Sequence, residues 1–210
     1  MASGLFITLE GPDGAGKSSQ AGLLADRIRS LGREVVLTRE PGGTALGEQV
    51  RSVLLESGAT GHDGLSDALL FNAARRRLIG EVIYPALHRG AVVVCDRFAD
   101  STLAYQGYGA GVPLNVLATL NDVATSGLRP TRTVLVDLPV SEALARRRAA
   151  SGELTRFETS AENDEAFHER VRAGFWALAA AEPARWRMVD GRFDREQVAA
   201  AIWFAVQDLF

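Results

Sequence analysis

The stretch Gly11-Pro12-Asp13-Gly14-Ala15-Gly16-Lys17-Ser18 decides the fold, because it fits the pattern G-x-x-x-x-G-K-[ST] at every fixed position. Its glycines let the backbone curl so that successive N–H groups point inward around phosphate oxygens, and the helix that follows adds the positive end of its dipole. The lysine of this pattern reaches the β- and γ-phosphates, and the hydroxyl binds Mg²⁺. We therefore predict that this segment, the phosphate loop, binds ATP–Mg.

The neighbours of the phosphate loop also fit its chemistry. The apolar run Leu5–Leu9 precedes it, and leucine and isoleucine recur at helical spacing over Ser18–Leu31. A chance match to the pattern is expected in roughly 1% of chains of this length. The strand before the loop and the helix after it favour a working phosphate site.

Short apolar runs alternate with helical patterns along the rest of the chain. Further strands are predicted over residues 34–38, 91–95, 133–137 and 187–189, and further helices over 46–55, 66–87, 113–125, 141–148, 164–181 and 195–209. Pro85 should bend the end of its helix. Strands that alternate with helices favour a parallel sheet covered on both faces. We predict a single α/β domain over residues 1–210 with a parallel sheet of about five strands, whose order does not follow from the pattern.

Composition narrows the classes of partner and compartment. The 23 basic and 26 acidic residues give a net charge of −3, so we expect neither a nucleic-acid nor a membrane partner. The single cysteine, Cys95, cannot form an intrachain disulfide and lies in an apolar run, which is typical of a reducing compartment. No apolar run is long enough to cross a bilayer, and residues 1–10 do not resemble a signal peptide. We expect a cytoplasmic protein.

Asp96 and Arg97 follow the apolar run 91–95 directly. Ligands of open α/β sheets bind beyond the carboxyl ends of the strands. A carboxylate at that place can hold Mg²⁺ together with Ser18, although an aspartate there is also common as a plain helix cap. The guanidinium beside it could grip a phosphate with two hydrogen bonds. We predict a second half of the phosphate site here.

Five segments carry a more specific pattern. They are Phe6–Glu10 leading into the phosphate loop, Thr38–Thr44 (Thr-Arg-Glu-Pro-Gly-Gly-Thr), Leu69–Arg75, Asp96–Gly107 with Ser-Thr-Leu-Ala-Tyr-Gln-Gly, and Arg156–Glu158. In order and content they resemble the bacterial thymidylate (dTMP) kinases, which are P-loop nucleoside monophosphate kinases. The resemblance implies a three-layer P-loop NTPase sandwich with a mobile lid and a homodimer. It also implies phosphorylation of dTMP to dTDP with ATP and Mg²⁺ in dTTP biosynthesis.

The resemblance also assigns the acceptor site. Phe71 would stack on thymine and Arg75 would hydrogen-bond its edge, since residues four apart share a helix face. From the residues alone, Phe71 is typical of a core and Arg75 of a solvated surface. Arg97 would hold the acceptor phosphate, helped by Arg51 and positioned by Glu40.

The same resemblance implies contacts to the sugar and the nucleotide. Asp13 would accept a hydrogen bond from the 3′-hydroxyl of the acceptor. Thr102, Tyr105 and Gln106 would line the pocket, with Tyr105 crowding the 2′ position; alone, these three are typical of a polar helix surface. Adenine would lie near the lid helix and residues 191–194. The ATP contacts would come from Gly11, Pro12, Asp13, Gly14, Ala15, Gly16, Lys17, Ser18 and Ser19.

Phosphoryl transfer needs one more cation besides Lys17 and Arg97, which act with Asp96 and Mg²⁺. The resemblance implies that this cation is an arginine of either the phosphate loop or a closing lid. The variable positions of the loop contain no arginine, so we expect a lid over about residues 149–163 to supply it. Arg156 is the first candidate and Arg148 the second. Arg146 and Arg147 are also available, but a run of three arginines is typical of a solvated helix face. This chain lacks the basic residue that bacterial relatives often carry near the lid start, so the choice of arginine stays open.

Three alternatives remain. A kinase for another nucleoside monophosphate would share the phosphate loop but not the preference for dTMP. A GTP-dependent switch protein would normally carry an Asn-Lys-x-Asp motif, which this chain lacks. A structural protein with a degenerate loop would be expected to lose Lys17, Ser18 or Asp96, and all three are present.

Overall fold

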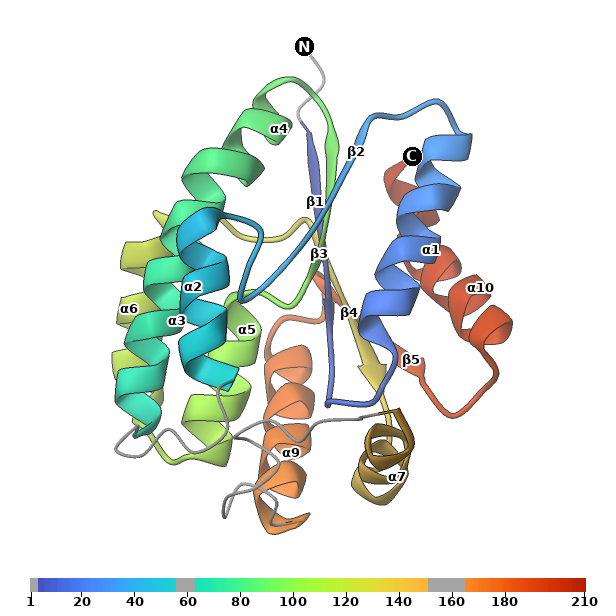
Figure 1. Cartoon of the computed structure of the whole chain (residues 1–210). Coiled ribbons are helices and arrows are strands. Elements are labelled where there is room, and N and C mark those ends of the chain that lie inside the picture. The colour runs from blue at the N-terminus through green and yellow to red at the C-terminus, as the bar shows by residue number, and fades with distance from the viewer. Residues whose placement is uncertain (1–3, 56–62, 151–164) are drawn as a thin grey trace.

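The computed structural model describes residues 4–55, 63–150 and 165–210, and its centre is a sheet of five parallel strands (Figure 1). The strands lie in the order β2-β3-β1-β4-β5. Their bounds are β1 Leu5–Glu10, β2 Val35–Arg39, β3 Val92–Asp96, β4 Arg132–Asp137 and β5 Trp186–Asp190. The predicted parallel α/β sheet is confirmed, with each strand within two residues of its expected place.

Strand register brings the predicted site residues to one end of the sheet. Leu9 of β1 pairs with Asp96 of β3, and Arg39 of β2 pairs with Asp96 from the other side. The residues that follow these strands therefore leave the same edge together. β3 is buried along its whole length, Cys95 included, as its uninterrupted apolar sequence requires in a central strand.

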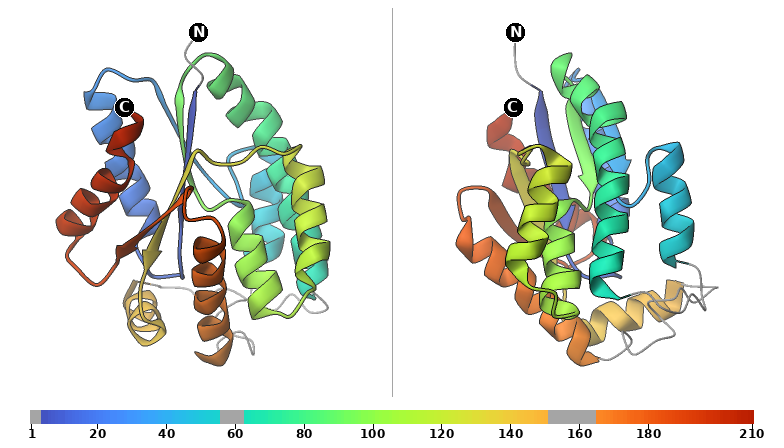
Figure 2. Two further views of the ribbon diagram at one scale, coloured as in Figure 1. Left: turned by 180° about the vertical axis from the view of Figure 1, so that it is seen from behind. Right: turned by 90° about the vertical axis from the view of Figure 1, so that its left-hand side faces the viewer.

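Helices cover both faces of the sheet (Figure 2). α1 and α10 lie on one face, where Leu24 and Ile28 of α1 and Ile202 of α10 share a core with β1 and β4. α3, α4, α5, α6 and α9 lie on the other side, and α2 packs outside α3. The bounds are α1 Lys17–Ser30, α2 Ala45–Leu55, α3 Gly64–Leu78, α4 Tyr84–His88, α5 Ala99–Thr102, α6 Leu114–Thr125, α7 Val140–Ala150, α9 Glu165–Ala181, α10 Arg195–Val206 and a final 3₁₀ turn, Gln207–Leu209.

The helix expected over residues 66–87 contains a widened turn. A π-helical segment, Ile79–Ile83, joins α3 to α4 just before Pro85. Proline lacks an N–H, and its ring crowds the carbonyl four residues earlier, so a wider turn lets the helix continue. A second π-helical segment, Leu103–Gly109, continues α5; the sequence pattern predicted no element at residues 99–109.

The expected lid lies almost wholly outside the described residues. Only its first two positions, Ala149 and Ala150, are described, and both belong to α7, so the lid itself stays a prediction. Among the described residues, no helix has the length and apolar character needed to span a membrane.

Candidate active site at the carboxyl ends of the strands

The phosphate loop leaves the end of β1 in a conformation that only glycine permits. Gly11 and Gly14 have φ values of 141° and 86°. A Cβ atom at either position would lie 2.3 Å from a backbone oxygen, that of Val136 or that of Ala143. The loop is thus wedged between β4 and α7, and its curled shape is built in before any ligand binds.

Lys17 begins α1 under this loop. Its side chain is buried and its Nζ donates to Pro12 O at 2.7 Å. Burial, with the nearby Arg97 guanidinium, lowers the pKa of Lys17 to about 8. Ser18 and Ser19 follow in the first turn of α1, where both are exposed. The amine is therefore held inside the loop while the two hydroxyls face outward.

Ser18 and Asp96 meet beside the loop, and their donor set fits a divalent cation. The Ser18 hydroxyl donates to Asp96 Oδ2. Asp96 Oδ1 is buried and has no hydrogen-bond partner among the described residues. A buried carboxylate oxygen without a partner costs free energy that an oxygen-seeking cation would recover. No cluster of three acidic, histidine or cysteine side chains occurs in the described part of the chain, so a cation here would depend on phosphates and water for its other ligands.

Arg97 joins the phosphate loop to α5. Its guanidinium donates to Asp13 Oδ1 at 2.7 Å, to Ser101 Oγ at 2.9 Å and to the Tyr105 hydroxyl at 3.0 Å. The Tyr105 hydroxyl in turn donates to Asp13 Oδ2 at 3.1 Å. Burial acts against ionisation of Asp13, but Arg97 and Lys17 hold its pKa well below the usual range. A fixed cation and a fixed anion thus stand side by side at the mouth of the loop.

Arg51 adds a second cation on α2. Its Nη1 donates to Pro41 O at 3.1 Å, and the side chain is partly buried. Burial and the like charge of Arg39 lower its pKa, while the charge of Asp96 acts in the opposite direction. Arg51 therefore lies within electrostatic reach of Asp96 and Arg97.

Glu40 and Arg75 form a buried pair, so the solvated surface position expected for Arg75 from the residues alone is wrong. Arg75 is only 1% exposed, and its Nε and Nη2 donate to the Glu40 carboxylate at 2.6–3.1 Å. Nη1 donates to Asn72 and Asn121, and Nη2 also donates to Thr102 Oγ1 at 3.1 Å. Each N–H of the guanidinium has an acceptor inside the protein in this arrangement. The Glu40 carboxylate binds Arg75, and the contact of Arg75 with a base edge stays a prediction.

The remaining acceptor residues border this pair. Phe71 lies one helical turn before Arg75 on α3 and is half-buried. Thr102 is buried behind the site, and Gln106 is buried in the π-helical segment that carries Tyr105. The structure therefore groups these side chains on α3 and on α5 with its continuation.

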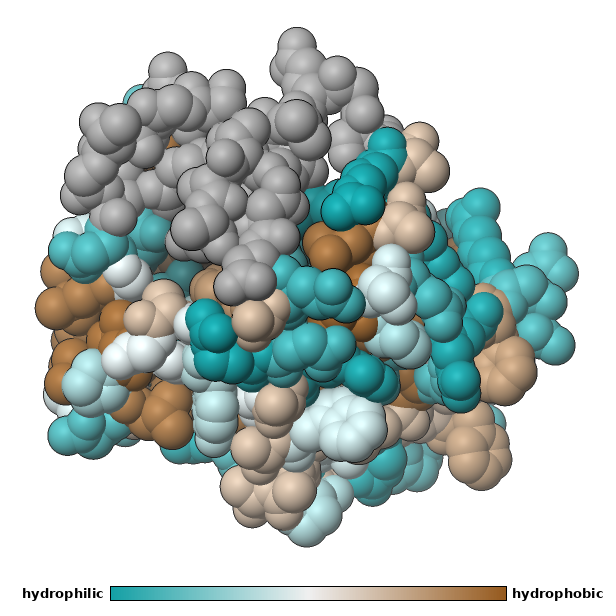
Figure 3. Space-filling model, turned by 90° about the horizontal axis from the view of Figure 1, so that it is seen from below, coloured by the Kyte–Doolittle hydropathy of each residue, from teal (hydrophilic) through white to brown (hydrophobic). Residues whose placement is uncertain are grey.

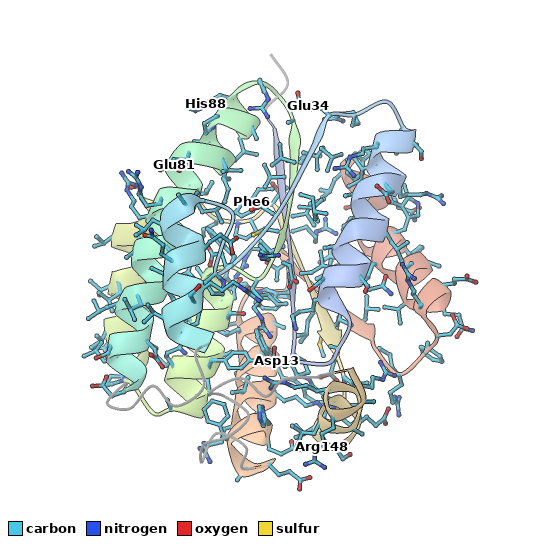
Figure 4. The ribbon with its side chains drawn as sticks, in the orientation of Figure 1. Phe6, Asp13, Glu34, Glu81, His88 and Arg148 are labelled. Atoms are coloured by element: carbon cyan, nitrogen blue, oxygen red, sulfur yellow. The ribbon has the colours of Figure 1, made fainter. Side chains whose placement is uncertain are left out.

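The three arginines of α7 point in different directions. Arg147 Nη1 lies 3.6 Å from Asp13 Oδ2, at the phosphate loop. Arg146 donates to Gly191 O at 2.8 Å, in the loop before α10. Arg148 is exposed and lies below Asp13 in Figure 4. Of the three, Arg147 is the one with an ion pair to the phosphate loop, while the role expected for Arg148 stays a prediction and Arg156 lies outside the described residues.

Comparison with known proteins identifies the family. Residues 9–202 match the sequence model of the thymidylate kinases. The chain belongs to the thymidylate kinase family. A thymidylate kinase of Pseudomonas fluorescens is 52% identical over 200 residues, covering 95% of this chain and 93% of that protein. A thymidylate kinase of Thermomicrobium roseum is 48% identical over 204 residues, covering 97% and 95%.

A solved structure of the same family confirms the fold. The crystal structure of thymidylate kinase from Ehrlichia chaffeensis superposes with a TM-score of 0.77 at 35% identity and covers 99% of each chain. The resemblance drawn from the five segments is confirmed by these relatives. The P-loop NTPase fold that it implied is confirmed as well.

Sequence reasoning missed several contacts of this thymidylate kinase site. Asn72 lies three residues before Arg75, inside a segment already singled out, so helical spacing could have suggested it. Asn121 lies 46 residues away on α6, and no pattern in the sequence links it to Arg75. Glu10 and Ser101 both lie within the family segments, and no sequence signal indicates that the Ser101 hydroxyl donates to Glu10 next to Arg97.

Proposed function

We propose that this chain transfers the γ-phosphate of ATP to the phosphate of dTMP, giving dTDP, in the cytoplasm. Membership of the thymidylate kinase family supports the substrate. The observation that carries the proposal is the junction of Arg97 with Asp13, because it sets a phosphate-binding cation against the loop that holds the donor. An acceptor phosphate on Arg97 would lie next to the γ-phosphate on Lys17.

The transfer is an in-line displacement. A phosphate oxygen of dTMP forms a bond to the γ-phosphorus, the bond from that phosphorus to the β-phosphate oxygen breaks, and ADP leaves. Arg97 would hold the dTMP phosphate, and Lys17 would neutralise the γ-phosphate of ATP. The two positive charges would let the two anionic groups come close enough to react. The acceptor phosphate is already anionic near neutral pH, and no side chain needs to remove a proton from it.

Magnesium would be held at Ser18 and Asp96. The exposed hydroxyl and the buried free carboxylate oxygen are the oxygen donors that this cation prefers. When bound, Mg²⁺ would neutralise negative charge on the phosphates during transfer.

Arg147 is the α7 residue that we propose as the additional cation for the transferring phosphoryl. Its guanidinium lies 3.6 Å from the Asp13 carboxylate, and its side chain is only 18% exposed. The phosphate loop supplies no arginine of its own. Binding of two phosphate-bearing substrates would give Arg147 a partner of greater charge than Asp13.

The acceptor base and sugar would lie between α3 and the α5 segment. Phe71 supplies a half-buried ring for thymine, and Gln106 and Tyr105 border the same space. In place of a direct contact, we assign Arg75 the task of holding α3, α6 and α5 together around that space, since its hydrogen bonds reach all three. Asp13 would accept a hydrogen bond from the sugar 3′-hydroxyl.

We also propose a homodimer through the α3–α6 face. Leu69 on α3 is 51% exposed, and Val123 on α6 is 72% exposed. Hydrophobic residues gather along the left edge of Figure 3, the side on which α2, α3 and α6 lie in Figure 1. Exposed apolar side chains that gather on neighbouring helices are typical of a protein–protein interface. Within each copy, one sheet with a common core supports a single kinase domain.

Turnover with a panel of nucleoside monophosphates tests the substrate. With ATP and Mg²⁺ present, kcat/KM should be highest for dTMP, lower for a ribonucleoside monophosphate that meets Tyr105, and lowest for purine monophosphates. Preference for a purine acceptor would contradict the proposal. Hydrolysis of nucleotide with no dependence on an acceptor would instead favour a switch protein.

A further inference from the structure

We propose that Glu10 is a positioning residue for Arg97 and ties the acceptor-phosphate cation to the phosphate loop. This inference rests on the role proposed for Arg97. Glu10 is the last residue of β1 and immediately precedes Gly11, the first residue of the loop. Its side chain is 0% exposed, so it cannot touch either substrate and must act through its neighbours.

The backbone of Arg97 needs outside support. Its φ is +69°, a left-handed conformation that costs an arginine free energy and persists only where neighbours enforce it. The Arg97 N–H donates to Leu9 O at 3.0 Å, and the Cys95 thiol donates to Arg97 O at 3.0 Å. The next N–H along the chain, that of Phe98, donates to Glu10 Oε1 at 2.8 Å. Within the described ranges, Glu10 is thus the side-chain carboxylate that holds the backbone of this turn.

The other carboxylate oxygen of Glu10 reaches the side chain of Arg97. Ser101 Oγ donates to Glu10 Oε2 at 2.6 Å, and the same Oγ accepts from Arg97 Nη1 at 2.9 Å. Because Glu10 takes the hydroxyl hydrogen, the Ser101 lone pairs are turned toward the guanidinium. Glu10 therefore fixes the backbone of Arg97 with one oxygen and its guanidinium with the other.

Keeping a carboxyl at this place is costly, which argues against a mere packing role. Burial, with the nearby Asp100 carboxylate, raises the pKa of Glu10, while Arg97 and the hydrogen bonds from Ser101 and Phe98 act in the opposite direction and favour the ionised carboxylate. An apolar residue of similar size would avoid that cost in the core. The two hydrogen bonds that the carboxyl accepts, both aimed at the Arg97 turn, are what an apolar residue could not supply.

Steady-state kinetics of E10Q, S101A and the double variant test the proposal. The new amide of E10Q can still accept from Phe98 N–H but cannot accept from the Ser101 hydroxyl, while S101A removes the bridging hydroxyl alone. We expect the KM for dTMP to rise about 10- to 100-fold in each, the size of a hydrogen bond to a charged group, with the KM for ATP within about threefold of wild type. The double variant should be no worse than S101A.

The matched control is E34Q. Glu34 is exposed and lies at the opposite end of the sheet from Asp13 (Figure 4), paired with Arg89 at 2.7 Å. It should keep the wild-type KM for both substrates. Circular dichroism melts of all variants separate loss of fold from loss of positioning, and S101A carries the test if E10Q does not fold.

Three results would overturn the role of Glu10. They are an unchanged KM for dTMP in E10Q and S101A, an equal rise in the KM values of both substrates, or additive effects in the double variant. A wild type that does not turn over dTMP contradicts the proposed function instead. In that case crystal structures of wild type and E10Q without ligand decide on Glu10: we expect the Arg97–Ser101 contact to be lost in E10Q, and an unchanged contact would refute the inference.

Discussion

Replacing Arg75 by methionine should destabilise the whole protein rather than only weaken nucleotide binding. Arg75 and Glu40 are 1% and 4% exposed at their side chains and lie 2.6 Å apart. The substitution leaves the Glu40 carboxyl buried without its cation, and it removes a donor from Asn72 and Asn121. Breaking a buried pair from one side costs about 3–5 kcal/mol. That is a large fraction of the roughly 5–15 kcal/mol that holds a typical domain folded.

The free energy of unfolding in urea, followed by circular dichroism at pH 7, measures this cost. Burial already raises the pKa of Glu40 above its usual value, and loss of Arg75 should raise it further. The raised pKa means that the cost is greatest when the carboxyl is ionised and shrinks as pH falls and Glu40 becomes protonated. The deficit of R75M should therefore be smaller at pH 5 than at pH 7.

The double variant E40L/R75M is the control for this reasoning. It removes both charges, so it should recover about 2 kcal/mol or more of the loss seen in R75M, although Asn72 and Asn121 still lack their partner. An R75M protein within about 1 kcal/mol of wild type, with a raised KM for dTMP alone, would refute the structural role. Arg75 would then act on the base directly.

Three further predictions concern the phosphates and the dimer. R147A should lower kcat about 100-fold or more with little change in the KM for dTMP. The kcat of R148A, a change on the exposed side of α7, should stay within about threefold of wild type. Equal effects of the two substitutions on kcat would contradict the assignment of Arg147. The pKa of Lys17 is about 8 in the free enzyme, so kcat/KM for ATP should fall as pH rises above 8 and the amine loses its charge, whereas kcat should persist to higher pH because bound phosphates favour the charged form. V123E should shift the molecular mass in light scattering from dimer to monomer, since it would place charge in the α3–α6 face; a wild-type monomer would contradict the proposed interface.

Much of the fold followed from the sequence because its signals are local. A Cβ atom on Gly11 or Gly14 would lie 2.3 Å from a neighbouring backbone oxygen, so only glycine fits at these positions. The glycine pattern of the phosphate loop therefore predicts the path of its backbone. The apolar run of β3 marked a strand buried on both faces. Strand order was beyond reach because parallel strands pair through long crossovers that leave no local trace.

The side-chain partners were harder to predict because they depend on packing. Arg147 and Arg148 are adjacent in sequence but point about 100° apart around a helix, and only the docking of α7 decides which faces Asp13. Glu40 was expected beside Arg97, but its carboxylate accepts hydrogen bonds from Arg75, 35 residues further along the chain. Asn121 completes the same cluster from α6 without any sequence signal.

A crystal structure of the protein with dTMP would show where the acceptor binds. We expect the phosphate to lie on the Arg97 guanidinium beside Asp13, with thymine against the ring of Phe71 and the sugar near Tyr105. We also expect Arg75 to keep its hydrogen bonds to Glu40. A nucleotide bound away from Arg97, or none at saturating dTMP, would refute the acceptor site proposed for Arg97.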